Sequence, residues 1–198
     1  MAAMLGARQE WSNDEQYFVW SVTNHDSVTP QQREKIWSAL EGLITNPGSM
    51  RAFYLAEAMQ ENNDWRRAIP LWRGYLDHAS PDNWEGHQLT TIEHLFEAYC
   101  RTGEWKTAEK FLFEQKDSML AAMPSALAKI AIVAAQHGAN DDAMRLWSLS
   151  ANLDRRDLES LSQLARTEAK PRLLSMYSQM KKDDPLSDIP DLALRLLQ

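Results

Sequence analysis

The chain has 198 residues, of which 44% are hydrophobic and 25% are charged, enough to bury a core of ordinary size. Val, Ile and Thr make up only about a tenth of the residues, so an extensive β architecture is excluded and the composition favours helices. Cys100 is the single cysteine, which excludes an internal disulfide and a thiolate-rich zinc site and fits a reducing compartment.

The net charge of −7 is distributed unevenly along the chain. Residues 1–100 carry 14 acidic and 7 basic side chains, whereas residues 101–198 carry 14 of each. An acidic surface repels phosphate backbones and anionic lipid headgroups, so we expect neither nucleic-acid nor membrane binding. The sequence has no run of 18 apolar residues, and its first ten residues lack a secretory apolar core. We therefore expect a cytoplasmic protein.

Helix signals recur along the whole chain. Two capping boxes, Ser12 with Glu15 and Thr29 with Gln32, place side chains where they satisfy the free N–H groups of a first turn. The apolar residues between such signals follow the three- and four-residue spacing of amphipathic helices. The segments predicted to be helical are 12–24, 30–45, 49–62, 65–79, 87–102, 105–117, 124–137, 140–152, 155–167, 171–182 and 190–197. Most of the linkers between them have two to six residues, which predicts antiparallel helical hairpins.

Three of these hairpins have the same layout. An alanine lies near the start of each second helix, with spacings of 40 and 35 residues: Ala68, Ala108 and Ala143. The turns before these helices contain Asn63, Gly103 and Gly138. A glycine there allows the left-handed backbone conformation that ends a helix. A period of this length predicts a helical repeat protein.

These hairpins resemble tetratricopeptide repeats, which are two-helix units of about 34 residues. Gly103, Gly138 and the closing Pro81 match that family, whereas Asn63 replaces the glycine of the first turn and Phe96 replaces a small residue at the helix contact. The resemblance covers 49–152 and extends weakly to hairpins at 12–45 and 155–198; half-a-TPR and Sel1-like hairpins are alternatives. It implies a single all-α domain, 1–198, folded as a right-handed superhelix of hairpins (an α-solenoid) with a leucine-rich capping helix at the end.

In that family the first helices of the units line a concave groove that binds peptides. Carried over by position, the groove-lining residues are Met50, Phe53, Glu57, Glu61, Thr90, Glu93, Glu97, Arg101, Ser125, Ala128, Ile132 and Gln136. Glu57 and Glu97 stand where the family's clamp for acidic chain ends needs asparagine, so the resemblance implies a basic or amphipathic peptide partner. The expected function is that of a non-catalytic adaptor or chaperone, and a small acidic chaperone of a secretion system is an alternative.

Catalytic motifs are scarce in this sequence. No phosphate-binding glycine loop, zinc-protease motif or nucleophile elbow occurs. The nearest arrangement to a site is Glu93, His94 and Glu97, with His87 a little upstream. Two carboxylates four residues apart share a helix face, which is more often a solvated surface than a site. We predict no enzyme activity, cofactor or metal, and the alternative is an accessory subunit of an enzyme that uses these groups.

Two segments outside the hairpins bear on partners. Trp84 lies in the long link 78–86, where it either covers the core or contacts a ligand. The C-terminal residues Ile189, Leu192, Leu194, Leu196 and Leu197 leave almost no polar helix face, which predicts either docking onto the repeats or a homo-oligomer. The tryptophans predicted to lie in the core are Trp37, Trp65, Trp72, Trp105 and Trp147.

Overall fold

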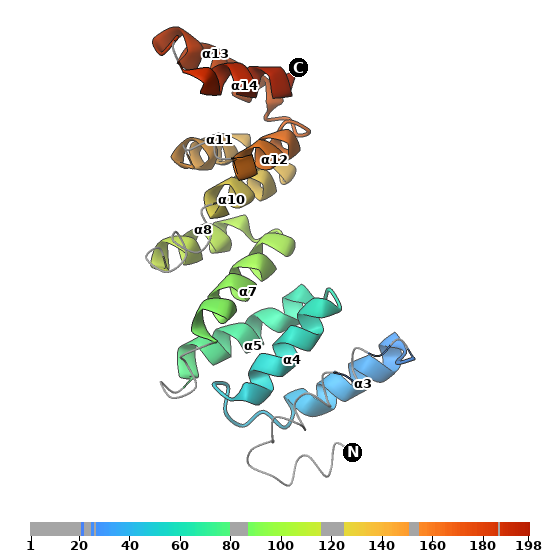
Figure 1. Cartoon of the computed structure of the whole chain (residues 1–198). Coiled ribbons are helices and arrows are strands. Elements are labelled where there is room, and N and C mark those ends of the chain that lie inside the picture. Colours follow the sequence, from blue (N-terminus) through green and yellow to red (C-terminus); the bar gives the residue numbers. More distant parts are fainter. Residues whose placement is uncertain are drawn as a thin grey trace. The chain divides into compact units, whose positions relative to one another are not determined.

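The computed structural model describes residues 21, 25, 27–79, 87–115, 125–150, 155–185 and 187–198. Every regular element among these residues is an α-helix, which confirms the predicted all-α class (Figure 1). The chain divides into two compact units, Met1–Thr102 and Gly103–Gln198. The division falls inside the range 49–152, which the repeat pattern predicts to be one core.

The helices described in unit 1 are α3 (Pro30–Glu41), α4 (Met50–Glu61), α5 (Trp65–His78) and α7 (Gln88–Arg101). α3 begins at the predicted capping box, in which the Gln32 N–H donates to Thr29 Oγ1 at 3.3 Å and the Thr29 N–H donates to Gln32 Oε1 at 2.9 Å. α3 ends earlier than predicted because the N–H groups of Leu43 and Ile44 bond three residues back, which tightens the chain into turns. The predicted helix 12–24 lies outside the described residues except for Ser21, which is helical.

The core of unit 1 forms where α5 packs against both α4 and α7. Trp72 and Tyr75 of α5 are buried, as is Phe53 of α4. The Phe53 ring lies edge-to-face on both of them, with centroid distances of 4.9 Å to Trp72 and 5.2 Å to Tyr75. Such aromatic pairs add about 0.5–1.5 kcal/mol to the stabilisation from burial, so this cluster anchors α4 to α5.

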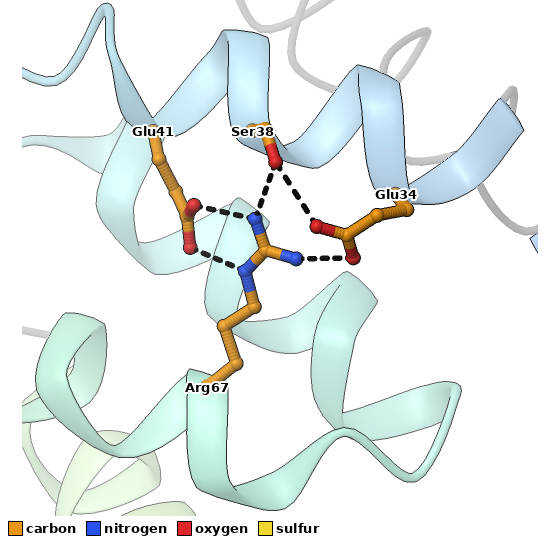
Figure 2. Close-up of polar contacts among 4 residues, drawn as sticks. All are labelled: Glu34, Ser38, Glu41 and Arg67. Carbon is orange, nitrogen blue, oxygen red and sulfur yellow. Dashed lines mark hydrogen bonds and ion pairs between the residues drawn. The ribbon is translucent and has the colours of Figure 1, made fainter. Parts of the chain in front are cut away.

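Arg67 of α5 fixes the position of α3 (Figure 2). Its Nε and Nη2 donate to the two carboxylate oxygens of Glu41 at 2.7 and 2.6 Å, a bidentate pair. Its Nη1 donates to Glu34 at 2.5 Å, and Nη2 also donates to Ser38 Oγ at 3.0 Å. The hydrogen bond to Glu41 is the largest cause of a raised pKa for Arg67. Because the three acceptors lie on successive turns of α3, one guanidinium sets the orientation of this helix on α5.

The helices described in unit 2 are α8 (Trp105–Glu114), α10 (Ala126–Gln136), α11 (Asn140–Leu149), α12 (Arg155–Leu164), α13 (Lys170–Asp183) and α14 (Asp188–Leu197). α10 packs against α8, α11 and α12. The Trp147 indole N–H donates to Tyr177 Oη at 2.9 Å and links α11 to α13. Arg145 of α11 forms an ion pair at 2.8 Å with Glu109 of α8. Buried apolar contacts and these cross-helix polar contacts together hold unit 2.

The turns of the three predicted repeats share one backbone conformation. Asn63, Gly103 and Gly138 have φ values of +62°, +79° and +75°. In the first and third turns, the residue after the left-handed one donates its N–H to the carbonyl oxygen five residues earlier. These bonds run from Asp64 to Met59 and from Ala139 to Ala134, both at 2.9 Å. This is the hydrogen bond of a Schellman cap. The asparagine that departs from the repeat pattern therefore takes the same left-handed conformation as the two glycines.

Replacing Asn63 with alanine is expected to lower the free energy of unfolding of unit 1 by about 1–2 kcal/mol. The Cβ of alanine is disfavoured at positive φ, and alanine lacks the short polar side chain that makes asparagine tolerable there. Asn63→Gly is expected to match or exceed the wild type, because glycine adopts this conformation freely. Urea unfolding monitored by circular dichroism compares the three proteins. An alanine variant as stable as the wild type contradicts the left-handed turn.

Candidate functional site

The outward side of α4 is a stripe of residues spaced four, three and four apart. Met50, Tyr54 and Glu57 are half-buried along this stripe, and Glu61 is exposed. The structure thus places three predicted groove residues, Met50, Glu57 and Glu61, on the accessible side of α4. Tyr54 was missed by the sequence analysis, although its spacing from Met50 and Glu57 is the spacing of one helical face.

Phe53, which was also predicted to line the groove, is instead a core residue. Its side chain is 2% exposed. Its ring contacts those of Tyr54, Trp72, Tyr75 and His87, with centroid distances of 4.7 to 5.5 Å. The family position predicts that Phe53 lies on the outward side of α4. Phe53 lies in the core instead, because burial among aromatic rings stabilises a large apolar side chain more than exposure at the edge of the stripe.

The outward side of α7 carries the four residues predicted there. Thr90, Glu93 and Glu97 are half-buried and Arg101 is exposed. Glu97 accepts a hydrogen bond from Arg101 Nε at 2.7 Å, as part of an i,i+4 ion pair. The guanidinium of Arg101 also lies 5.7 Å from the ring centroid of Trp65. Arg101 thus covers part of the acidic surface.

The environment of Trp65 corrects one of the five core predictions. Trp65 is only half-buried, because it opens α5 at the edge of the unit and its ring lies under the guanidinium of Arg101. The other four tryptophans, Trp37, Trp72, Trp105 and Trp147, are buried as predicted.

α4 and α7 run in the same direction. The Phe53 ring lies 4.7 Å from that of His87, and Gln60 Nε2 lies 2.6 Å from His94 Nδ1. The two contacts are separated by seven residues on the α4 side, from 53 to 60, and by seven on the α7 side, from 87 to 94. The two helices therefore advance together over two turns.

Both helices carry two glutamates close in sequence to the residues of the contact between Gln60 and His94. On α4, Glu57 and Glu61 lie three residues before and one residue after Gln60. On α7, Glu93 and Glu97 lie on either side of His94, and both carboxylates favour its protonated form. We call Glu57, Glu61, Glu93 and Glu97 the acidic face.

A hydrogen-bonded network beneath the acidic face joins three helices. The Trp72 indole N–H donates to Gln60 Oε1 at 3.1 Å, and its ring stacks on His94 with a centroid distance of 5.0 Å and an interplanar angle of 18°. Because an indole N–H can only donate, the Gln60 amide must turn its oxygen to Trp72 and its NH₂ group to His94. His94 Nδ1 then accepts, so the imidazole is neutral with its proton on Nε2. Sequence patterns did not reveal this network, since its members lie on three different helices.

Burial shifts the pKa values of Glu57, Tyr54 and His94. Desolvation, with a smaller contribution from Glu61, raises the pKa of Glu57 to about 7. Desolvation also raises the pKa of Tyr54, with Glu57 as a second cause. For His94 desolvation lowers the pKa, while Glu93 and Glu97 act in the opposite direction. Near neutral pH, Glu57 is therefore partly protonated, whereas His94 is neutral.

Glu57 and His94 are expected to make the stability of unit 1 depend on pH in opposite senses. Folded Glu57 holds its proton more tightly than unfolded Glu57, so its contribution falls as pH rises from about 4.5 to about 7. Glu57→Gln is therefore expected to be more stable than the wild type at pH 8, by about 1–2 kcal/mol after discounting for solvent screening. At pH 4.5 the two proteins are expected to be nearly equal.

His94 affects the stability of unit 1 at acidic pH. Its pKa is lowered in the folded state, so its contribution is complete above pH 6.5 and is lost as pH falls below that value. Thermal unfolding of wild type and Glu57→Gln at several pH values measures both effects, and the acid-side loss is expected to persist in the variant. An equal stability difference at pH 4.5 and pH 8 contradicts the raised pKa of Glu57.

The third predicted groove helix, α10, offers a different surface from the one expected. Ala128 and Ile132 were predicted to line the groove, but both are buried in unit 2. An almost wholly apolar helix is covered on several sides at once, here by α8, α11 and α12. The exposed residue among the four predicted positions is Gln136, and Ser125 is half-buried. Trp84 and Pro81 lie outside the described residues.

The two candidate histidines contact different aromatic rings. His87 contacts Phe53 and His94 stacks on Trp72. Cys100 is buried. Within the described residues no group of three or more His, Cys, Asp or Glu is placed to hold a metal ion. No helix in the described part of the chain has both the length and the apolar character needed to cross a bilayer.

Comparison of the chain with models of protein families, with curated proteins and with solved structures finds no match in any of the three. The acidic face of unit 1 is therefore interpreted from its own geometry and charge.

Proposed function

We propose that this chain is a tetratricopeptide-like adaptor or chaperone, a superhelix of helical hairpins whose acidic face binds a basic or amphipathic peptide. The common left-handed turn at Asn63, Gly103 and Gly138 supports repeated hairpins of one design. The parallel course of α4 and α7, both in unit 1, supports a continuous surface on the first helices of two successive hairpins.

The observation that carries the peptide-binding proposal is the environment of Glu57. This carboxylate is half-buried, and the charged neighbour that affects it most is another carboxylate, Glu61. Ionising it costs free energy because burial removes hydration and Glu61 adds a second negative charge, a cost that a nearby cation would offset. A lysine or arginine from a partner supplies that cation, and the neighbouring Met50 and Tyr54 offer apolar surface to the rest of an amphipathic peptide.

The direct test is a titration with a synthetic amphipathic helix that has lysines on its polar face and leucines on the other. Fluorescence anisotropy is expected to show binding that weakens as salt rises, because the contact is electrostatic. Glu93→Lys/Glu97→Lys is expected to weaken binding by about tenfold or more, which corresponds to about 1.4 kcal/mol. Circular dichroism checks that the variant remains helical.

A matched control separates the acidic face from overall charge. Glu159 and Glu168 are exposed residues of unit 2, so Glu159→Lys/Glu168→Lys changes the net charge equally but leaves the acidic face intact. Its affinity is expected to stay within about twofold of the wild type. Equal loss in both double variants, or equal affinity for a peptide whose lysines are replaced by glutamates, contradicts recognition at the acidic face.

Peptide binding is also expected to release a proton from Glu57. Its pKa of about 7 leaves a large protonated fraction near neutral pH, and a cation brought beside it favours the carboxylate. Calorimetric titration at pH 7 in buffers of different ionisation enthalpy measures the released proton. Glu57→Gln is expected to abolish the release. Binding of the same peptide with no proton release in the wild type contradicts contact at Glu57.

A further inference from the structure

α14, at the end of unit 2, has two apolar sides. One side, formed by Pro190, Ala193 and Leu197, is buried in unit 2, where α14 packs against α12 and α13. The other side is formed by Ile189, Leu192 and Leu196, which are 40%, 45% and 42% exposed. These residues are spaced three and four apart, so they form one stripe along the helix.

Charges flank this stripe in a definite order. Asp188 is the first residue of α14, and Arg195 lies in its last turn. They are seven residues apart, two helical turns, and therefore lie on the same flank of the stripe. Asp191, on the polar side, already forms an ion pair with Lys181 of α13. The flank next to the apolar stripe is thus negative at its start and positive at its end.

We propose that the stripe on α14 binds the same stripe on a second copy of this chain, with the two helices antiparallel. In an antiparallel pair related by a two-fold axis, residues on one flank face the same flank of the other helix in reverse order. Asp188 then lies opposite Arg195 of the partner subunit, and this pairing occurs twice. In a parallel pair related by a two-fold axis this flank would face the opposite flank of the partner helix, so Asp188 and Arg195 would not pair across the contact. With Leu192 at the centre, Ile189 packs near Leu196 of the partner subunit.

The stripe is small, so the dimer belongs to the weak class of associations. Three side chains with about two-fifths of their surface exposed contribute on the order of 250 Å² per copy, less than the roughly 800 Å² per partner of a stable complex. The expected dissociation constant is therefore about 10–100 µM. This association uses unit 2 and does not depend on peptide binding at the acidic face.

The first test is sedimentation velocity of the full chain between roughly 5 and 500 µM, the range that brackets the expected dissociation constant. The wild type is expected to shift from monomer to dimer, and Leu192→Glu is expected to stay monomeric. Leu149 of α11 is 56% exposed, so Leu149→Glu is a matched control that should still dimerise. A wild type that stays monomeric overturns the proposal and leaves the stripe to another partner. A Leu192→Glu variant that dimerises like the wild type also overturns it.

The second test uses charge reversal to determine the direction of pairing. Asp188→Arg and Arg195→Asp each place like charges opposite one another in an antiparallel homodimer, so each alone is expected to be monomeric. Mixed together, the two variants restore opposite charges at both ends and are expected to form a heterodimer. Circular dichroism confirms that each variant is folded. A mixture that remains monomeric while the wild type dimerises overturns the antiparallel arrangement.

Discussion

Replacing Trp72 with alanine is expected to lower the free energy of unfolding of unit 1 by about 3–5 kcal/mol. The side chain is fully buried between α4 and α7. Its removal leaves a cavity, and it also removes the edge-to-face contact with Phe53 and the stacking on His94. Gln60 Oε1 loses the donor that lies 3.1 Å away. A loss of this size is a large fraction of the stability of an ordinary domain.

Trp72→Phe separates the hydrogen bond from the packing and keeps the test informative if the alanine variant does not fold. Phenylalanine retains most of the ring contact but has no N–H donor, so a loss of about 1–2 kcal/mol is expected. Without the indole donor, the Gln60 amide is free to turn so that its oxygen accepts a hydrogen bond from a protonated His94 Nδ1. The pKa of His94 is therefore expected to rise in Trp72→Phe, as measured by NMR titration of its ring. An unchanged His94 pKa contradicts the network, and an alanine variant that loses less than about 1 kcal/mol contradicts the core position of Trp72.

Replacing Gly48 with alanine is expected to have the second-largest effect, a loss of about 2–3 kcal/mol. Gly48 lies in the link between α3 and α4, against the end of α5. A Cβ at this position would lie 2.2 Å from the carbonyl oxygen of His78 and 2.5 Å from the backbone nitrogen of Ala79. Both are main-chain atoms, so a side-chain rotation cannot relieve the clash and the link must move off α5. Urea unfolding measures the loss.

Gly42→Ala is the matched control for this substitution. The nearest atoms to a Cβ at Gly42 are the carbonyl oxygens of Ala39 and Ser38, both at 3.6 Å, and its φ is −62°. Alanine fits there without strain and reduces the conformational freedom of the unfolded chain, so a gain of about 0.4–1 kcal/mol is expected. Equal effects of the two substitutions contradict the close approach of the link to α5.

Helix positions were predictable from the sequence because they depend on local signals. The capping box at Thr29 and Gln32 fixes the start of α3 through bonds between residues three apart. The three hairpin turns were located from Asn63, Gly103 and Gly138, whose left-handed conformations follow from their place at helix ends. Ends of helices were less predictable: the helix pattern of α3 continues to 45, but the backbone tightens after Glu41.

The candidate site was only partly predictable. Glutamates at helical spacing indicated the outward sides of α4 and α7, and the structure places them there. The predictions for Phe53, Ala128 and Ile132 were wrong, because all three are buried. Their positions in the repeat pattern do not show which neighbouring helices cover an apolar side chain. The bidentate pairing of Arg67 with Glu41 and the contact of Gln60 with His94 were missed because they join residues 26 and 34 positions apart. Such contacts depend on packing, which no local pattern encodes.

We propose above all that a basic amphipathic peptide binds on α4 and α7 of unit 1. NMR chemical-shift mapping of the full chain during a peptide titration tests it most directly, because it reports the location of binding residue by residue. The largest amide shifts are expected in α4 around Tyr54, Glu57 and Glu61, and in α7 around Glu93 and Glu97. Shifts confined to unit 2, or the same map with the charge-reversed peptide, contradict the claim.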